Sequence, residues 1–274
     1  MSKLIVPGGQ PDENGRLLSI TPESAGWEYV GFEAYRLEPG QTIEQETGDR
    51  EVCLVLLSGL ANVEAGGQSY ERIGRRMSVF EPLAPYAVYV PADDRFRLEA
   101  VTLTEVAVCS APGQGRLEAR LIPPEKIGVE QRGSGYTERT VRNILPEQEE
   151  AESLLVVEVF TPAGHWSSYP PHKHDQLDLP HESLLEETYY HKVSPGQGFA
   201  LQRVYTDDLS LNETLAVKSG DAVLVPCGYH PVSAPPGYDV YYLNVMAGPV
   251  RTWKFHNDPQ HEWLMTPGQE VPKR

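Results

Sequence analysis

The chain has 274 residues, of which 40% are hydrophobic and 23% charged, and it carries a formal net charge of −16 at pH 7. This length and composition predict a folded protein with one large or two ordinary cores, and they exclude a disordered chain. The negative charge argues against nucleic acid and anionic membrane surfaces as partners, because both attract basic faces.

Three cysteines, Cys53, Cys109 and Cys227, lie far apart in apolar runs, which indicates reduced core residues rather than a disulfide framework. No apolar stretch approaches the roughly 18 residues of a membrane span, and residues 1–7 lack the apolar core of a signal peptide. We therefore expect a soluble cytoplasmic protein that acts on a small molecule, with homo-oligomer formation left open.

Short runs rich in Val, Leu and Tyr alternate with Gly and Pro along the chain, and no long run has a helical apolar period. This pattern is typical of an all-β protein. In the first half, strands are predicted at 29–37, 51–57, 60–65, 77–81, 87–90 and 96–103, with a hairpin at Gly66–Gly67. A Gly- and Pro-rich charged segment at 111–135 then predicts a domain boundary.

The second half repeats this order. Predicted strands at 154–160, 187–193, 221–225 and 238–245 correspond to 32–37, 51–57, 77–81 and 96–101. We interpret the repeat as a duplicated β-barrel with a period of roughly 130 residues. The predicted domains are 1–115, a barrel without metal ligands, and 116–274, a metal-binding barrel with an aromatic C-terminal tail.

All eight histidines lie at or beyond His165. His172 and His174 would share a face if the backbone is extended, because side chains alternate along a strand. Glu187, Tyr189 and His191 would share a face for the same reason, and His230 follows a hydrophobic strand and a tight turn. Three imidazoles and one carboxylate from neighbouring strands suit a borderline divalent metal.

The acidic ligand has three candidates. Asp178 lies in a segment with no predicted strand, and Glu186 would face away if Glu187 faces inward. We favour Glu187, because it alternates with Tyr189 and His191 in a predicted strand. The predicted metal ligands are therefore His172, His174, Glu187 and His230.

Two motifs in this region resemble the paired motifs of the cupin superfamily. The residues that match are Gly164, His172, His174, Glu187, Gly220, Pro226, Gly228 and His230. Three spacings depart from the superfamily pattern: seven residues separate Gly164 from His172, twelve separate His174 from Glu187, and one separates Gly228 from His230.

Longer runs resemble the 5-deoxy-glucuronate isomerases of bacterial inositol catabolism, relatives of the 4-deoxy-threo-hexosulose-uronate isomerases. They include Tyr-Pro-Pro-His-Lys-His-Asp at 169–175, Leu-Glu-Glu-Thr-Tyr-Tyr-His at 185–191 and Tyr-Leu-Asn-Val-Met-Ala-Gly at 242–248. The resemblance implies a bicupin, two tandem cupin barrels of the double-stranded β-helix or jelly-roll type. It also implies an aldose–ketose isomerisation of 5-deoxy-D-glucuronate to 5-dehydro-2-deoxy-D-gluconate through a metal-stabilised enediol.

Such a reaction needs one metal ion, a proton-transferring group and a cation for the substrate carboxylate. Zinc or manganese fits the ligand set, as do iron, nickel and cobalt. The candidates for the proton-transferring group on the inward face are Tyr189 and His191, together with Glu187 if its second carboxylate oxygen is free. Arg203 is the first candidate for the carboxylate, and the alternatives are Lys173, Lys192 and Arg251.

Two other functions are compatible with the same ligands. A cupin dioxygenase would use redox-active iron and consume oxygen, whereas a non-catalytic cupin would only bind a sugar. The long runs favour the isomerase, because ligand type and fold do not separate these three functions.

Overall fold

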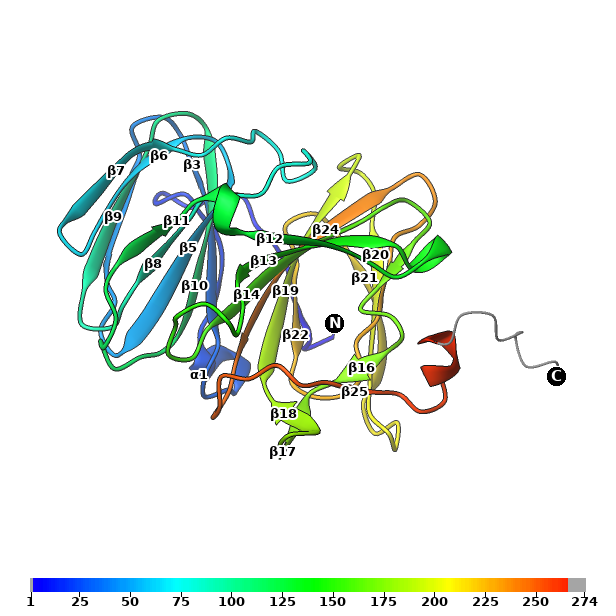
Figure 1. Ribbon diagram of the computed structural model, residues 1–274. Helices are drawn as coiled ribbons and strands as arrows, with labels where there is room; N and C mark the ends of the chain where they lie inside the picture. Colours follow the sequence, from blue (N-terminus) through cyan, green and yellow to red (C-terminus); the bar gives the residue numbers. More distant parts are fainter. Residues whose placement is uncertain (1, 266–274) are drawn as a thin grey trace.

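The computed structural model describes residues 2–265, and in this part of the chain almost all regular structure is β (Figure 1). The helical elements there are short. They are α1 (Pro22–Ala25), η1 (Pro124–Lys126), η2 (Gly135–Thr137) and η3 (Glu262–Met265). Within residues 2–265, no helix has the length and apolar character needed to cross a membrane.

The first barrel consists of a six-stranded and a four-stranded sheet. The larger sheet contains, in spatial order, β11 (Arg120–Ile122), β8 (Ala87–Val90), β5 (Arg50–Ser58), β10 (Thr104–Pro112), β3 (Gly31–Leu37) and β2 (Arg16–Ile20). The smaller contains β4 (Thr42–Glu46), β9 (Arg95–Ala100), β6 (Ala61–Ala65) and β7 (Gln68–Ile73).

The second barrel has the same plan. Its larger sheet contains β1 (Ile5–Val6), β22 (Ala222–Val225), β19 (Glu186–Ser194), β24 (Asp239–Ala247), β14 (Leu155–Thr161), β13 (Arg139–Leu145) and β12 (Gly128–Arg132). Its smaller sheet contains β15 (Trp166–Ser167), β23 (Val232–Ser233), β20 (Ala200–Tyr205) and β21 (Asn212–Val217). Two short pairs lie beside it: β16 (His172–Lys173) with β25 (His256–Asn257), and β17 (Asp175–Asp178) with β18 (Glu182–Leu184).

The equivalent strand orders confirm the predicted all-β bicupin. One strand of each larger sheet comes from outside the predicted half. β1, from the start of the chain, pairs with β22 of the second barrel, and β11 pairs with β8 of the first. β11 and β12 both lie in or beside the predicted boundary segment, and they join different barrels. The division into 1–115 and 116–274 stays a prediction.

One predicted strand is wrong. Residues 77–81 form bends and turns, and the counterpart of β22 is β8. The reason is local, because the Glu81 carboxylate accepts hydrogen bonds from the backbone amides of Met77 and Ser78 at 2.7 and 3.0 Å. These amides are therefore satisfied without a neighbouring strand.

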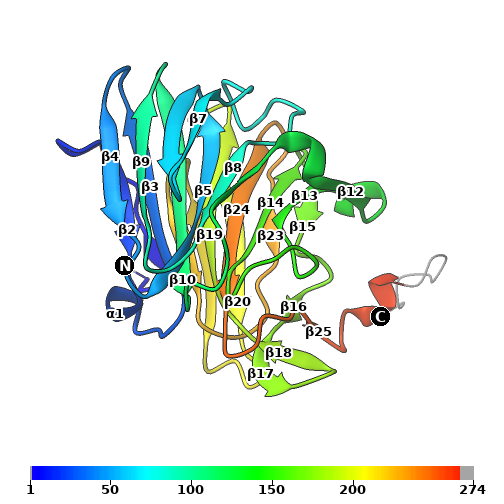
Figure 2. The same ribbon diagram turned by 60° about the vertical axis from the view of Figure 1, so that its left-hand side comes forward.

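The two larger sheets pack against each other, so their central strands are buried on both faces (Figure 2). Phe32 of β3 contacts Tyr190 of β19, with ring centroids 5.3 Å apart. The other face of each larger sheet lines the interior of its own barrel. Burial on both faces explains why 51–57 is a continuous apolar run, whereas a half-exposed strand would alternate.

Two glutamates fasten the barrels to each other in a reciprocal way. Glu51 of β5 accepts hydrogen bonds from the amides of residues 152–154, at 2.6 to 2.8 Å. Glu186 of β19 accepts from the amides of residues 28–30, at 2.7 to 2.9 Å. Each carboxylate thereby satisfies three amides of the other half of the chain, and Glu186 faces away from the inside of its barrel.

A buried ionic cluster also joins the barrels. The Arg76 guanidinium makes two hydrogen bonds to the Glu158 carboxylate, at 2.7 and 2.8 Å. Arg142 and the Tyr241 hydroxyl donate to the same carboxylate, at 2.9 and 2.8 Å. Although burial would raise the pKa of Glu158, the two guanidinium groups lower it, so this carboxylate is ionised.

The change Glu158→Gln should destabilise the protein, because it leaves two buried guanidinium groups without a counter-charge. We expect the free energy of unfolding to fall by about 3–5 kcal/mol, measured by urea denaturation. Glu64→Gln is the control, since Glu64 is exposed and lies 3.9 Å from Arg97, and its effect should stay below about 1 kcal/mol. Equal effects of the two changes would contradict a structural role for the cluster.

Candidate metal centre

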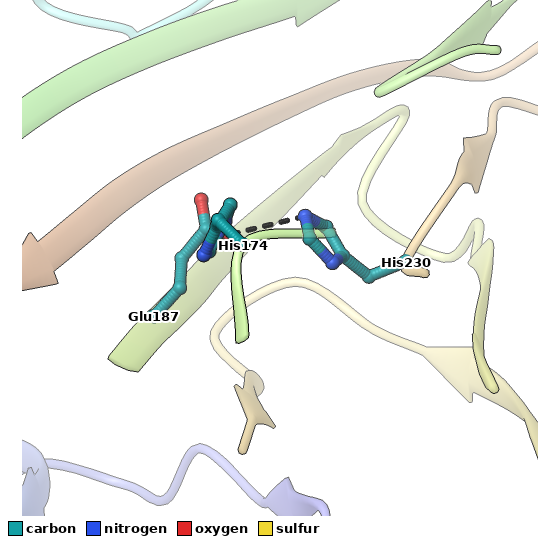
Figure 3. Close-up of side chains that lie close together, drawn as sticks. All are labelled: His174, Glu187 and His230. Carbon is teal, nitrogen blue, oxygen red and sulfur yellow. Dashed lines mark hydrogen bonds and ion pairs between the residues drawn. The ribbon is translucent and has the colours of Figure 1, made fainter. Parts of the chain in front are cut away.

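Three buried side chains meet inside the second barrel (Figure 3). His174 follows β16, Glu187 lies on β19 and His230 follows the turn after β22. The Nε2 atoms of His174 and His230 lie 3.0 and 3.2 Å from the same oxygen, Oε2 of Glu187. Possible ligand atoms of these three residues all lie within 4.8 Å of one another.

In His174 and His230, the hydrogen bond of Nδ1 determines whether Nε2 carries a proton or a lone pair. Nδ1 of His174 lies 3.1 Å from the carbonyl oxygen of Leu185, and Nδ1 of His230 lies 2.8 Å from that of Gly228. A carbonyl oxygen only accepts, so each Nδ1 carries the proton, and a neutral ring then directs the Nε2 lone pair at Glu187. Two lone pairs facing a carboxylate oxygen leave room for a cation between them, so these residues fit a divalent metal.

The charge balance of the three residues agrees with this reading. Burial alone would raise the pKa of Glu187, but hydrogen bonds and charge from His174 and His230 lower it to about 2. Burial alone would lower the pKa of His174, but Glu187 outweighs burial and raises it. Without a metal, the space between these groups therefore attracts a proton.

A fourth side chain orients the carboxylate. The Asn244 amide on β24 donates a 2.7 Å hydrogen bond to Oε1 of Glu187, which leaves Oε2 for the histidines. Asn244 and Tyr189 are paired positions on neighbouring strands, so both point to the inside of the barrel. An asparagine among the apolar residues of β24 is a polar exception that alternation could have detected.

His172 lies beside this group without being part of it. Its ring centroid is 4.9 Å from that of His230, 6.3 Å from that of His174 and 4.7 Å from that of Phe255. Burial, the largest cause, lowers its pKa well below the ordinary value. His172 is thus a neutral imidazole at the edge of the cluster.

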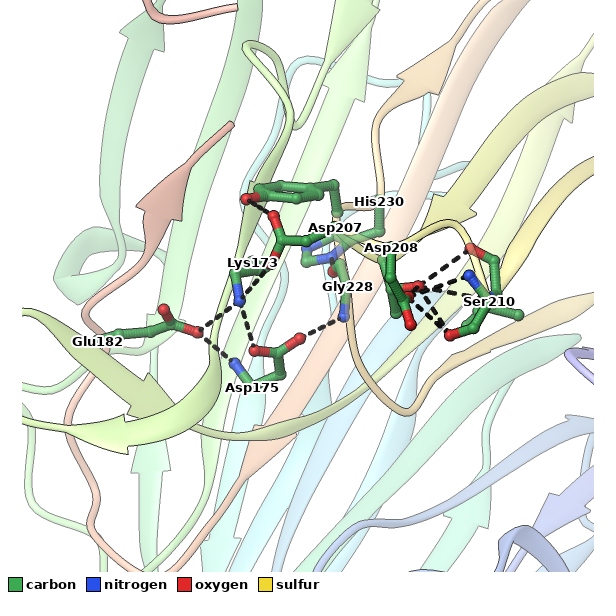
Figure 4. A network of polar contacts seen from close by, with 11 residues as sticks. Lys173, Asp175, Glu182, Asp207, Asp208, Ser210, Gly228 and His230 are labelled. Atoms are coloured by element: carbon green, nitrogen blue, oxygen red, sulfur yellow. Dashed lines mark hydrogen bonds and ion pairs between the residues drawn. The ribbon is translucent and has the colours of Figure 1, made fainter. Parts of the chain in front are cut away.

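A polar network holds the two histidine segments together (Figure 4). Asp175 accepts hydrogen bonds from Lys173 at 3.0 Å and from the Gly228 amide at 2.8 Å. Lys173 also lies 3.2 Å from Asp207, and the Asp175 amide donates to Glu182 at 2.8 Å. The residues on either side of His174 are therefore tied to the turn that carries His230, which fixes both rings relative to Glu187.

A cavity of about 760 Å³ opens onto Glu187 and His172. Three hydroxyl groups gather in its wall: Ser168 lies 3.0 Å from the Tyr189 hydroxyl and 3.2 Å from the Tyr242 hydroxyl. Ser168 adopts φ +48°, a left-handed conformation that costs a non-glycine residue roughly 1–2 kcal/mol. This strained position aims its hydroxyl at both tyrosines.

A family model for the KduI/IolB family matches residues 4–264 of the chain. The chain belongs to this family. A 5-deoxy-glucuronate isomerase of Geobacillus kaustophilus is 66% identical over 265 residues, which cover 97% of this chain and 96% of the relative.

Solved structures agree with this membership. The crystal structure of an IolB-like protein from Salmonella typhimurium has a TM-score of 0.94 and 52% identity, covering 96% of this chain and 99% of its own. An oxalate decarboxylase from Bacillus subtilis, studied for its Mn(II) centres, has a TM-score of 0.63 at 13% identity, covering 94% and 80%. The second likeness concerns the cupin fold alone.

The other predicted residues of this family member lie in different places. Tyr189 lines the cavity, whereas His191 lies behind it, with its ring stacked on Tyr189 and Nε2 2.9 Å from Gln202. Arg203 bonds to Asn212 and covers the Tyr205 ring, outside the residues that line the cavity. The alternative ligand Asp178 ends the exposed strand β17, so the expectation of no strand there is wrong.

Sequence reasoning missed several polar residues around the cavity, among them Ser168, Tyr242, Asn244 and Arg139. Tyr242 and Asn244 alternate on β24 and could have been found from their spacing. Ser168 and Arg139 gave no such signal. The first depends on an unusual backbone conformation, and the second lies on β13, whose partner strand β12 is part of the predicted boundary segment.

The buried His191 generates a prediction about pH. Burial, the largest cause, lowers its pKa to about 4, below the ordinary value of about 6.5 for an unfolded chain. Between these values the unfolded chain binds a proton that folded His191 does not, so stability should fall as pH drops from 6.5 to 4. The free energy of unfolding, measured by urea denaturation at pH 7 and pH 4, should therefore fall by about 3 kcal/mol less in His191→Gln than in wild type. His181→Gln, at an exposed histidine, should keep the wild-type loss, and an unchanged loss in His191→Gln would contradict the assignment.

Proposed function

We propose that this protein is a metal-dependent aldose–ketose isomerase of inositol catabolism that converts 5-deoxy-D-glucuronate to 5-dehydro-2-deoxy-D-gluconate. Relatives at 50% to 66% identity carry the name 5-deoxy-glucuronate isomerase. The observation that carries the proposal is the meeting of two imidazole Nε2 atoms with one carboxylate oxygen beside a cavity lined by hydroxyl groups. We also propose a cytoplasmic location.

His174, Glu187 and His230 would hold the metal ion, and His172, whose ring lies beside His230, would complete the set. Bound there, a divalent ion, zinc or manganese or otherwise iron, nickel or cobalt, supplies a Lewis acid that stabilises negative charge on the substrate oxygens. The supporting observation is the lone-pair arrangement of the two inner nitrogens.

The chain's own groups must move two protons. The proton on C2 is taken up and returned at C1, while the hydroxyl proton at O2 is lost and O1 gains one. With its pKa at about 2, Glu187 is ionised at neutral pH, and it is the carboxylate that lines the cavity within residues 2–265. We propose that Glu187 also takes part in the transfer between the carbons.

Tyr189 suits the transfer between the oxygens. Burial, then the charge of Glu187, raises its pKa well above the ordinary value, so it keeps its proton at neutral pH and can donate to a substrate oxygen. The Ser168 hydroxyl connects Tyr189 with Tyr242, so a proton given up by one group can be replaced from the next.

His191 would act through Tyr189, because its ring stacks on the tyrosine from behind with centroids 6.0 Å apart. Arg203 stays a prediction for the substrate carboxylate. Its guanidinium already bonds to Asn212, at 2.9 and 3.0 Å.

The test is metal analysis of the purified protein together with proton NMR of 5-deoxy-glucuronate in deuterium oxide. We expect loss of the aldehyde-derived signal, deuterium in the product and no dissolved oxygen consumed. Removal of the metal by a chelator should abolish turnover, and adding a divalent metal should restore it. A metal-loaded protein that leaves the sugar unchanged would contradict the proposal, and oxygen uptake would favour the dioxygenase.

Asn244→Ala tests how the carboxylate is oriented. Without the 2.7 Å hydrogen bond to Oε1, Glu187 can turn away from the histidines, so metal affinity should fall about 10- to 100-fold. Competition with a chelator of known affinity measures this change. Asn212→Ala is the control, since Asn212 is exposed and its amide contacts Arg203 outside the cavity, and it should leave metal affinity unchanged. Equal affinity of Asn244→Ala and wild type would exclude the orienting role.

A further inference from the structure

A hairpin of β12 and β13 forms one wall of the cavity, and two of its arginines line that cavity. Arg132 and Arg139 are paired positions on these strands, and both line the cavity that also contains Glu187. They come from a part of the chain for which neither the family motifs nor the relatives' names give a role.

The two guanidinium groups differ in what neutralises them. Arg132 makes a 2.7 Å ion pair with Glu130, and its guanidinium lies 5.8 Å from the Trp253 ring. Arg139 bonds to the Thr137 carbonyl oxygen at 3.0 Å. Within residues 2–265, no carboxylate lies within 4 Å of the Arg139 guanidinium. In a chain with a net charge of −16, such a cation in a cavity wall is available for an external anion.

The surroundings of Arg139 strengthen its attraction for an anion. Burial partly shields the Arg139 guanidinium from water, and this is the largest cause that lowers its pKa. Val141 and Val159, which are paired across β13 and β14, continue the wall toward Tyr242. A charge pair in such an apolar, partly dry setting is stronger than one at the surface.

Tyr242 connects Arg139 with the metal ligands. Burial raises the pKa of the Tyr242 hydroxyl, and of the two charged groups that act on it, Arg139 lowers the pKa while Glu187 raises it. Both ends of the cavity thus lie close enough to influence one hydroxyl group. An open-chain sugar acid has the same arrangement, with reacting oxygens at one end and a carboxylate at the other.

The other cations named from the sequence already have partners. Lys173 pairs with Asp175 and Asp207, and Lys192 pairs with Glu105. Arg251 donates to backbone carbonyl oxygens, among them that of Leu154 at 2.7 Å. None of these three side chains lines the cavity.

We propose that Arg139 binds the carboxylate of the substrate and makes the enzyme specific for sugar acids. This inference rests on the proposed function, since it assumes that the substrate's reacting end faces His174, Glu187 and His230. The planar guanidinium would make a two-bond contact to the carboxylate, and the valine wall would face the carbons between the two ends.

The test measures kinetics, metal content and melting temperature for Arg139→Met and Arg139→Lys. Arg132→Met and Arg203→Met are the control variants. Arg139→Met should lower kcat/KM for 5-deoxy-glucuronate about 30- to 1,000-fold, mostly through KM, with metal content unchanged. Arg139→Lys should recover part of this loss, because it keeps the charge without the fork. Arg132→Met, on the same wall but already paired with Glu130, should lose less than Arg139→Met.

The inference is overturned if Arg139→Met stays within threefold of wild type, or if Arg203→Met alone raises KM. A separate binding measurement keeps it apart from the proposed function. By calorimetry, metal-loaded wild type should bind D-gluconate more tightly than the neutral sorbitol, and Arg139→Met should lose that preference. If wild type prefers gluconate but does not isomerise 5-deoxy-glucuronate, the proposed function fails and the carboxylate site stands. If wild type has no preference, the site fails.

Discussion

The alternation of β19 is the constraint on which the rest of the structure depends. Successive side chains of a strand point to opposite faces, and both faces of β19 are covered. One face carries Glu186 and Tyr190 into the contact between the barrels, whereas the other carries Glu187 and Tyr189 into the cavity. A shift of one residue in the pairing of β19 would exchange these two sets. The contact between the barrels therefore also fixes the register of the metal ligand.

The first barrel supports this register from outside. Its interior is filled by apolar side chains such as Leu54, Phe96 and Leu98. Its larger sheet packs its apolar face against the larger sheet of the second barrel. Arg76 and the amides of residues 28–30 also bond to Glu158 and Glu186 of that barrel. A barrel without histidines thus contributes by holding the large sheet of the other barrel in place.

Much of the candidate site followed from the sequence because it depends on local alternation. Because side chains alternate along a strand, the sequence placed Glu187 on the inward face and Glu186 on the opposite one. The apolar runs located most of the strands. What the sequence could not provide depends on contacts between distant segments. Arg139 reaches the cavity from a strand that pairs with part of the predicted boundary segment. Arg203, the first candidate for the substrate carboxylate, bonds to Asn212 instead. The strand expected at 77–81 failed because a single carboxylate satisfied its amides locally.

Because β1 pairs in the second barrel and β11 pairs in the first, no single cut of the chain gives one fragment for each complete barrel. A fragment containing 1–115 would lack β11, and one containing 116–274 would lack β1 together with Leu4, which is buried in the core of the second barrel. Each fragment would expose a strand edge that invites pairing with other chains. During synthesis, β1 emerges early but finds β22 only when most of the chain has been made. Each barrel thus has the strand order of a complete barrel but takes one strand from the other predicted half of the chain.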